Sequence, residues 1–232
     1  METDEKISAF LPVREFQEGR YVVFATKNGT VKKTDLMAYS NPRKAGIIAI
    51  TLDDGDEVIG VRLTDGQQEL ILSTREGQAI RFKEEDVRSM GRNAGGVRGI
   101  TLDAGDSVVG LDVVSPGATL LAVAERGYGK RTEMDEYRLT RRGGKGIITM
   151  KTTDKTGLVV GVRMVTDDDD IMLVTDGGKV IRTPVRGISV IGRNTQGVRL
   201  IDLAEGEKVV GVACLAEKEE DEDEGGAGNG ES

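Results

Sequence analysis

Residues 140–146 read TRRGGKG, which brings three cationic side chains and three glycines into seven positions. Cationic side chains neutralise phosphate oxygens, and glycines let a backbone approach a bound group closely. Two ligands fit this composition: a nucleotide, and the backbone of a nucleic acid. A nucleotide loop of the GxxxxGK[ST] kind lies between a strand and a helix, and no helix pattern is evident here. The segment therefore favours a nucleic-acid contact over a nucleotide pocket.

The remaining composition offers little catalytic chemistry. The chain has 232 residues, no histidine and one cysteine, Cys214. These absences exclude Ser-His and Cys-His nucleophile pairs, imidazole metal ligands and zinc clusters. No supporting catalytic group accompanies the four tyrosines in the sequence. We therefore expect a chain without catalytic residues, metal site or cofactor of its own.

The location of the protein is predicted from the same features. The N-terminal sequence METDEKISAFLPV lacks the basic-then-apolar layout of a signal peptide. No apolar run approaches the roughly 20 residues that a membrane span requires. A single cysteine cannot form an internal disulfide, which favours a reducing compartment. These features predict a cytoplasmic protein with no membrane partner.

The net charge of −8 is distributed unevenly along the chain. Residues 217–232 hold eight acidic groups and one lysine, so they contribute −7 and leave about −1 for residues 1–216. A segment so acidic and so poor in apolar residues cannot form a core. We predict a disordered acidic tail over residues 217–232. Any basic surface on the remainder must come from the way its charges are sorted.

Residues 1–216 contain a tandem repeat with a period of about 50 residues. The first marker occurs as TKNGTVKKT, STREGQAIRF, AERGYGKRT and TDGGKVIRT, with turn glycines Gly29, Gly77, Gly127 and Gly178. The second occurs as RKAGIIAITL, RNAGGVRGITL, RGGKGIITM and RNTQGVRLIDL, with Gly46, Gly96, Gly146 and Gly197. The third occurs as DGDEVIGV, AGDSVVGL, KTGLVVGV and EGEKVVGV. Three markers that keep one period over four copies indicate four structural units.

Each period reads as four short strands joined by tight turns. In the second copy these strands are VIGVRLT, ELILST, QAIRFK and GVRGITL. Four-stranded repeats of this length are typical of propeller blades. We therefore predict an all-β, propeller-like array, either a closed four-bladed ring, an open arc or part of a larger ring. The predicted repeats span residues 7–57, 58–107, 108–157 and 158–208, with a last strand to 216.

The two ends of the array continue the same pattern. Residues 7–13, ISAFLPV, match the first strand of the first copy, and VACLAE after Gly211 matches the start of a further unit.

Cationic residues recur at fixed positions of the repeat. Lys33, Arg81, Arg131 and Arg182 lie four residues after the turn glycines, and Lys32 and Lys130 flank two of them. Arg92, Arg142 and Arg193 lie four residues before the second glycine, and Arg98 and Arg199 lie two residues after it. Equivalent positions in an array of blades map to equivalent points on its rim, so we expect a curved cationic stripe there. The alternative is a set of solvated strand ends balanced by nearby acidic residues.

With these motifs in hand, the chain resembles the C-terminal domain of the DNA gyrase A subunit over residues 7–215. TRRGGKG matches six of the seven positions of that family's QRRGGKG box, with Thr140 in place of glutamine, and GTVKKT, GYGKRT and GRNTQGV are also similar to family blade sequences. The resemblance implies a β-pinwheel, a propeller-like disc whose neighbouring blades exchange strands and whose basic perimeter wraps DNA. The family's disc commonly has six blades with the box in the first. Here four copies are visible and the near-match lies in the third, so residues 140–146 are either the box or a relative of it.

The function implied by the resemblance is wrapping of duplex DNA without sequence specificity, in support of ATP-dependent negative supercoiling. The implied partners are the gyrase B subunit, the remainder of the gyrase A subunit, and duplex DNA, in a bacterial, nucleoid-associated enzyme. ATP, Mg²⁺ and the cleavage chemistry are expected in other parts of that enzyme. Two alternatives remain open: the corresponding domain of topoisomerase IV, and a protein-binding propeller scaffold. The predicted DNA-binding residues are Lys32, Lys33, Arg43, Lys44, Arg81, Arg92, Arg98, Lys130, Arg131, Arg141, Arg142, Gly143, Gly144, Lys145, Gly146, Arg182, Arg193 and Arg199.

Overall fold

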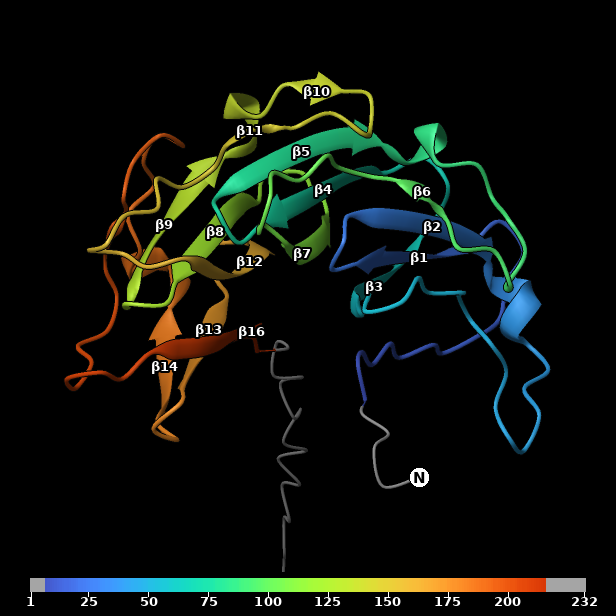
Figure 1. Ribbon diagram of the computed structural model, residues 1–232, viewed down its shortest axis with the longest axis horizontal. Helices are drawn as coiled ribbons and strands as arrows, with labels where there is room; N and C mark the ends of the chain where they lie inside the picture. The colour runs from blue at the N-terminus through green and yellow to red at the C-terminus, as the bar shows by residue number, and fades with distance from the viewer. Residues whose placement is uncertain (1–6, 216–232) are drawn as a thin grey trace, which may run out of the picture.

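The computed structural model describes residues 7–215, and within them the chain is all-β with four short 3-10 helices (Figure 1). The strands are β1 (Tyr21–Thr26), β2 (Thr30–Asp35), β3 (Val58–Thr64), β4 (Glu69–Thr74), β5 (Gln78–Lys83), β6 (Val97–Arg98), β7 (Val108–Val113), β8 (Thr119–Ala124), β9 (Tyr128–Glu133), β10 (Leu139–Thr140), β11 (Ile147–Ile148), β12 (Val159–Val165), β13 (Asp170–Thr175), β14 (Val180–Pro184), β15 (Val198–Arg199) and β16 (Val209–Cys214). The helices are η1 (Leu36–Tyr39), η2 (Glu84–Asp86), η3 (Met134–Glu136) and η4 (Val185–Gly187). The predicted acidic tail lies outside the described residues.

The strands form four sheets, or blades, that follow one another around an open arc (Figure 1). The first blade has the strand order β3-β1-β2-β6, and the third has the equivalent order β12-β8-β9-β15. The second has the order β7-β4-β5 with both β10 and β11 on the outer edge of β5, and the fourth has the order β16-β13-β14. This arrangement confirms the predicted propeller-like array of four repeats.

The outermost strand of each of the first three blades comes from the following repeat. β6 lies antiparallel to β2, with Val97 opposite Val31, and β15 lies antiparallel to β9, with Val198 opposite Gly129. On the second blade, β10 pairs in parallel and β11 pairs antiparallel with the same strand, β5. Neighbouring blades therefore exchange strands, as the resemblance implies.

The hydrophobic core lies between consecutive blades. On β4, Leu70 and Leu72 face the core shared with the first blade, whereas Ile71 faces the core shared with the third. Because both faces of an inner strand are buried, these strands read as continuous apolar runs, such as TLLAVA in β8, in place of an apolar–polar alternation. The stacking of blades thus explains the sequence pattern of the inner strands.

The recurring turn glycines have a steric cause that is clearest at Gly77. Its φ of 85° lies in the left-handed region, and a Cβ there would lie 2.1 Å from the carbonyl oxygen of Met150. Met150 belongs to the following repeat, so this turn also packs against the exchanged segment. Glycine satisfies both requirements.

Two details of the predicted repeat boundaries are wrong. Residues 7–13 form no strand; Leu11 and Val13 pack against the outer face of the first blade. β16, which contains the VAC of this segment, is the inner strand of the fourth blade and does not begin a further unit. The reason is that each blade begins with a hairpin, such as β1–β2, and its inner strand, such as β3, comes later in the chain. The true unit therefore starts later than the predicted one.

Candidate nucleic-acid interface

The glycine-rich loop, residues 140–146, connects β10 to β11 on the outer edge of the second blade. The preceding repeat holds its backbone: the Gly143 amide donates to the Gly99 carbonyl at 2.6 Å, and the Thr101 amide donates to the Gly144 carbonyl at 2.9 Å. The loop therefore has its sequence in the third repeat and its position on the blade of the second.

Two of the three glycines in this loop require the absence of a side chain. Gly143 and Gly146 have φ values of 87° and 79°, and a Cβ on Gly146 would lie 2.3 Å from the Ala79 carbonyl oxygen. Gly144 is different, because its φ is not in the left-handed region and its Cβ would meet only Ile80 Cδ1, at 3.6 Å. The structure therefore gives no steric reason for glycine at this position.

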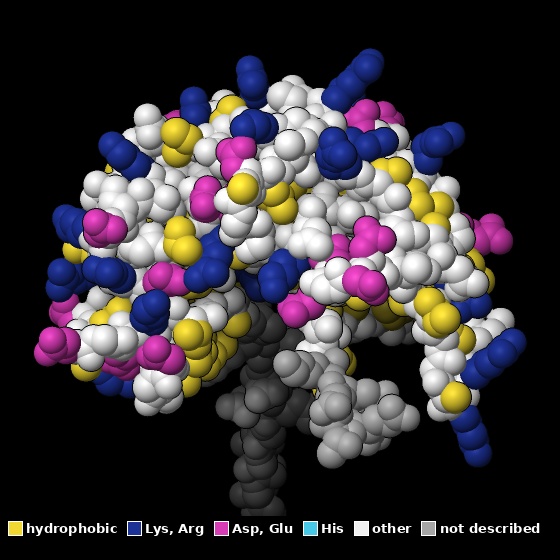
Figure 2. All heavy atoms as spheres, viewed as in Figure 1, with side chains coloured by type: hydrophobic (Ala, Val, Ile, Leu, Met, Phe, Trp, Pro, Cys, Tyr) yellow, Lys and Arg dark blue, Asp and Glu magenta, His cyan; other side chains and the backbone are white. Residues whose placement is uncertain are grey.

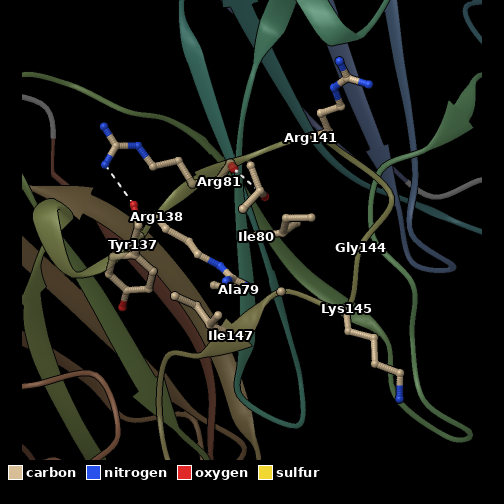
Figure 3. Close-up of a pocket in the computed structure, with 11 residues that line it drawn as sticks. Ala79, Ile80, Arg81, Tyr137, Arg138, Arg141, Gly144, Lys145 and Ile147 are labelled. Carbon is tan, nitrogen blue, oxygen red and sulfur yellow. Dashed lines mark hydrogen bonds between the residues drawn. The ribbon is translucent and has the colours of Figure 1, made fainter.

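A cavity of about 230 Å³ lies beside the glycine-rich loop (Figure 3). Arg138 and Arg141 line it, both are exposed, and within the described residues neither side chain has a hydrogen-bond or ion-pair partner. Lys145 also lines it and is paired with Asp103 at 2.5 Å, but both of these side chains are exposed, so the pair contributes little and opens readily.

The backbone of the same loop supplies further donors. Within residues 7–215, the amide groups of Gly144, Lys145 and Gly146 donate to no acceptor. Consecutive amides without an acceptor, next to cationic side chains, have the donor chemistry that suits a phosphate oxygen. Arg138 was missed in the sequence analysis. Its position seven residues after Arg131, matched by Arg88 after Arg81, was the available signal.

The cations that recur after the turn glycines have a structural role in three of the four repeats. Lys33 Nζ donates to the Glu84 carbonyl at 3.0 Å, Arg81 Nη1 to the Met134 carbonyl at 2.8 Å, and Arg131 Nε to the Ile188 carbonyl at 2.9 Å. Each acceptor lies in or directly after the 3-10 helix of the following blade. The recurring cation therefore joins one blade to the next.

The last member of this series shows the contrast. Arg182 is on the fourth blade, which has no following blade within the described residues, and its side chain is 60% exposed and paired with Asp170. Lys33 and Arg131 are buried, and Arg81 is largely buried. The prediction of an exposed stripe is therefore wrong for these three residues, because satisfying carbonyls across the blade interface requires the same charge as binding phosphate.

Lys32 and Lys130 are also corrected, since both side chains are fully buried. Lys32 donates to the carbonyls of Ala49 and Arg92, and Lys130 donates to those of Gly192, at 2.6 Å, and Arg193, at 2.5 Å. Each ammonium group thus holds loops of the second glycine marker in place: Lys32 those around Gly46 and Gly96, and Lys130 the one around Gly197.

Desolvation of these ammonium groups affects their ionisation. Burial, reinforced by the Arg92 guanidinium, lowers the pKa of Lys32 from 10.5 to about 8. Burial also lowers the pKa of Lys130 to about 8, although the carboxylate of Glu136 opposes this shift.

Arg92, Arg142 and Arg193 form a third repeated contact and remain partly exposed. Their Nη1 atoms donate to the carbonyls of the preceding loop at Ile48 (3.2 Å), Arg98 (3.0 Å) and Ile148 (3.2 Å), respectively. A guanidinium has five N–H donors, so each retains donors for a ligand. These residues position the loops and stay at the surface.

The other predicted cations lie on the surface. Figure 2 shows Lys and Arg side chains along the outer margin of the arc, with acidic side chains among them. The exposed predicted residues are Arg43, Lys44, Arg98, Arg141, Lys145, Arg182 and Arg199. Their assignment as DNA contacts stays a prediction.

Comparison with known proteins gives the same picture as the geometry. The sequence model of the family described as "DNA gyrase C-terminal domain, beta-propeller" matches residues 20–65, 68–115, 118–166 and 169–216, one match for each blade. The chain belongs to this family. The DNA gyrase A subunit of Salmonella typhimurium is 50% identical over 223 residues, which cover 96% of this chain and 25% of that protein. This domain thus spans about a quarter of the length of that relative.

Two solved structures share the fold. The structure of a DNA gyrase A C-terminal domain has a TM-score of 0.80 at 30% identity, and the match covers 88% of this chain and 68% of that one. The crystal structure of a topoisomerase IV C-terminal domain has a TM-score of 0.86 at 30% identity and covers 93% and 68%. Within residues 7–215 of this gyrase-type domain, no helix has the length and apolar character to cross a membrane.

The bridging role of the recurring cation can be tested by comparing two equivalent positions. Arg131→Ala removes donors to a buried carbonyl between the third and fourth blades, so we expect it to lower the free energy of unfolding by about 2–3 kcal/mol. Arg182→Ala, at the equivalent exposed position, should change it by less than about 0.5 kcal/mol. Urea unfolding followed by circular dichroism measures both. Equal effects of the two substitutions would contradict the bridging role.

The buried lysines predict a pH dependence of stability. Their pKa of about 8 in the folded protein lies below the ordinary 10.5, so between these pH values the unfolded chain binds more protons than the folded one. The free energy of unfolding should therefore rise from pH 8 to pH 10.5 in the native protein relative to a Lys32→Met, Lys130→Met variant. Parallel urea-unfolding series at stepped pH measure this difference. A constant difference across that range would show that the two pKa values are not lowered.

Proposed function

We propose that this domain binds duplex DNA along the outer margin of the arc, without reading base sequence, and bends the DNA around itself. The observation that carries the proposal is the glycine-rich loop. Within residues 7–215, the Arg138 and Arg141 side chains have no partner there and lie beside backbone amides that have no acceptor. Such groups fit phosphate oxygens, which are the same for every base sequence.

The arc shape supports wrapping as well as binding. DNA resists bending over distances shorter than its persistence length of roughly 50 nm, so a tight bend needs contacts distributed along a curved path. Exposed cations on successive blades supply such a path, with Arg98 on the first blade, the glycine-rich loop on the second and Arg199 on the third.

Membership of the gyrase family supports a role in a larger enzyme. There the domain would be non-catalytic and would present a wrapped DNA segment for ATP-dependent negative supercoiling. A gyrase B subunit, together with the remainder of the gyrase A subunit, would supply strand cleavage and ATP hydrolysis with Mg²⁺. The second candidate function is the corresponding DNA-binding role in a topoisomerase IV. The TM-score of 0.86 to the C-terminal domain of such an enzyme supports it.

The proposal predicts salt-dependent binding to unrelated duplex sequences. The logarithm of affinity should fall linearly with the logarithm of salt concentration, with a slope of about −0.9 for each neutralised phosphate. Gel shifts over a salt series measure it. Binding that is absent, insensitive to salt, or restricted to one DNA sequence would overturn the proposal.

A second experiment separates wrapping from binding. Arg138→Ala with Arg141→Ala should reduce the salt slope by about two phosphate equivalents, and should impair wrapping more than affinity because other exposed cations remain. Sealing of a nicked plasmid in the presence of the domain measures wrapping, since DNA held with fixed handedness shifts the linking number. Arg20→Ala with Lys27→Ala removes the same charge from the first blade and is the control. Equal losses of affinity and of linking-number shift would mean that the loop is one binding patch among others.

A further inference from the structure

A groove of about 570 Å³ lies at the hairpin turn of the third blade, apart from the glycine-rich loop. Four cations line it: Arg126 from the β8–β9 turn, Lys155 from the loop before β12, Arg199 from β15, and Lys208 from the loop before β16. All four are exposed. We name this the Tyr128 groove, after the tyrosine in its wall.

Tyr128 joins two of these cations. Arg199 Nη2 donates to its hydroxyl at 3.2 Å, and Lys155 Nζ lies 5.2 Å from the centre of its ring. Contacts with the ring and the hydroxyl hold both cations at the same wall while leaving other N–H donors free.

The acidic groups around the groove do not cancel this charge. Glu207 is the one carboxylate that lines it among the described residues. This carboxylate is paired with Lys179, at 2.7 Å, and accepts a hydrogen bond from the Thr175 hydroxyl. Arg199 is paired with Asp202, but the two side chains are 60% and 86% exposed, so this pair is weak. Lys208 lies 3.9 Å from Glu125, a distance beyond a hydrogen bond.

The repeats provide an internal comparison that sets the third blade apart. At the position of Arg126 the first two blades have Asn28 and Glu76, and each of their amides is held at 2.9 Å by an aspartate carboxylate, from Asp56 and Asp106 respectively. In the third blade the Arg126 amide is held instead by the Thr156 carbonyl, also at 2.9 Å.

The other positions of the turn follow the same trend. Tyr128 is replaced by Thr30 and Gln78 in the first two blades, and the outer-strand position of Arg199 is held by Arg98 and Ile148. Among the hairpin turns of the first three blades, the third alone combines an aromatic ring with clustered cations and has no aspartate that accepts from the turn amide.

From this arrangement we infer that the Tyr128 groove is a binding site for phosphate groups, and that its ligand is the backbone of duplex DNA passing along the third blade. The assignment to DNA rests on the proposed function. Arg199 on the edge strand β15 and Lys155 on the loop before β12 line the same groove, so both can donate hydrogen bonds to one phosphate. A phosphate source other than DNA, such as a free nucleotide, has the same chemistry and must be distinguished by experiment.

The test compares two variants that lose the same charge. Lys155→Gln with Arg199→Gln removes two cations of the groove, and Arg20→Gln with Lys27→Gln removes two exposed cations of the first blade. We expect the groove variant to lose about tenfold or more in duplex affinity at about 0.1 M salt and about two units of salt slope, and the control to lose much less. An unchanged thermal midpoint in both variants establishes that each is folded. Equal losses in the two variants, or none in the groove variant, would overturn the inference.

A second measurement reports phosphate binding without DNA. The hydrogen bond from Arg199 lowers the pKa of Tyr128. A phosphate bound at the groove should raise that pKa again, because it stabilises the neutral phenol relative to tyrosinate. The absorbance of tyrosinate, with and without inorganic pyrophosphate, reports the shift after subtraction of a Tyr128→Phe variant. No shift would overturn the phosphate site, and a shift without loss of duplex affinity in the groove variant would overturn the assignment to DNA in favour of a free phosphate compound.

These outcomes are separate from those of the proposed function. If the native domain shows no salt-dependent affinity for DNA, the proposed function fails whatever the groove does. If the native domain binds DNA and the groove variant binds equally well, only the groove inference fails.

Discussion

None of the first three blades in this domain is built by one repeat alone, and this constraint governs the rest of the structure. The outer edge of each of the first three blades is an open row of backbone groups until the following repeat lays its short strand there. An open edge costs free energy when it is buried unpaired and invites wrong pairing when it is exposed. Exchange of strands pairs part of this edge and at the same time joins each blade to the next. Backbone pairing, together with the cores between the blades, thus holds consecutive blades in the arc.

The buried cations serve the same constraint. A strand that crosses to another blade brings loops whose carbonyls face the blade interface, away from water. Lys32, Arg81 and Arg131 satisfy these carbonyls with side chains long enough to reach across the interface. A charged donor forms stronger hydrogen bonds than a neutral one, which offsets part of the free energy of burying it. A repeat position that is cationic in every copy can therefore serve to stabilise the fold and need not bind a ligand.

This explains what sequence reasoning reached and what it could not. The fold was predictable because glycine turns and apolar runs are local signals that repeat four times. The surface was only partly predictable, because a cation that binds a carbonyl inside the protein and a cation that binds phosphate outside it have the same letter and the same spacing. Burial depends on partners far away in the sequence, such as Ile188, which lies 57 residues after Arg131. Of the four cations in the Tyr128 groove, the sequence analysis predicted Arg199. It missed Arg126, Lys155 and Lys208, because the other repeats have no cation at their positions.

The exchanged strands also place the candidate binding groups. A loop that must leave one blade, pair with the edge of another and return lies at the outer margin, because the faces between consecutive blades are filled by the hydrophobic cores. The glycine-rich loop meets this condition: Gly146 packs against the Ala79 carbonyl of β5, whereas the Arg141 side chain is exposed. Cations in such loops can change without disturbing the cores, and cations on the inner strands cannot. The outer margin is therefore the part of this fold in which charge is free to serve a ligand, and the same pairing that holds the blades together holds those charges along a curve.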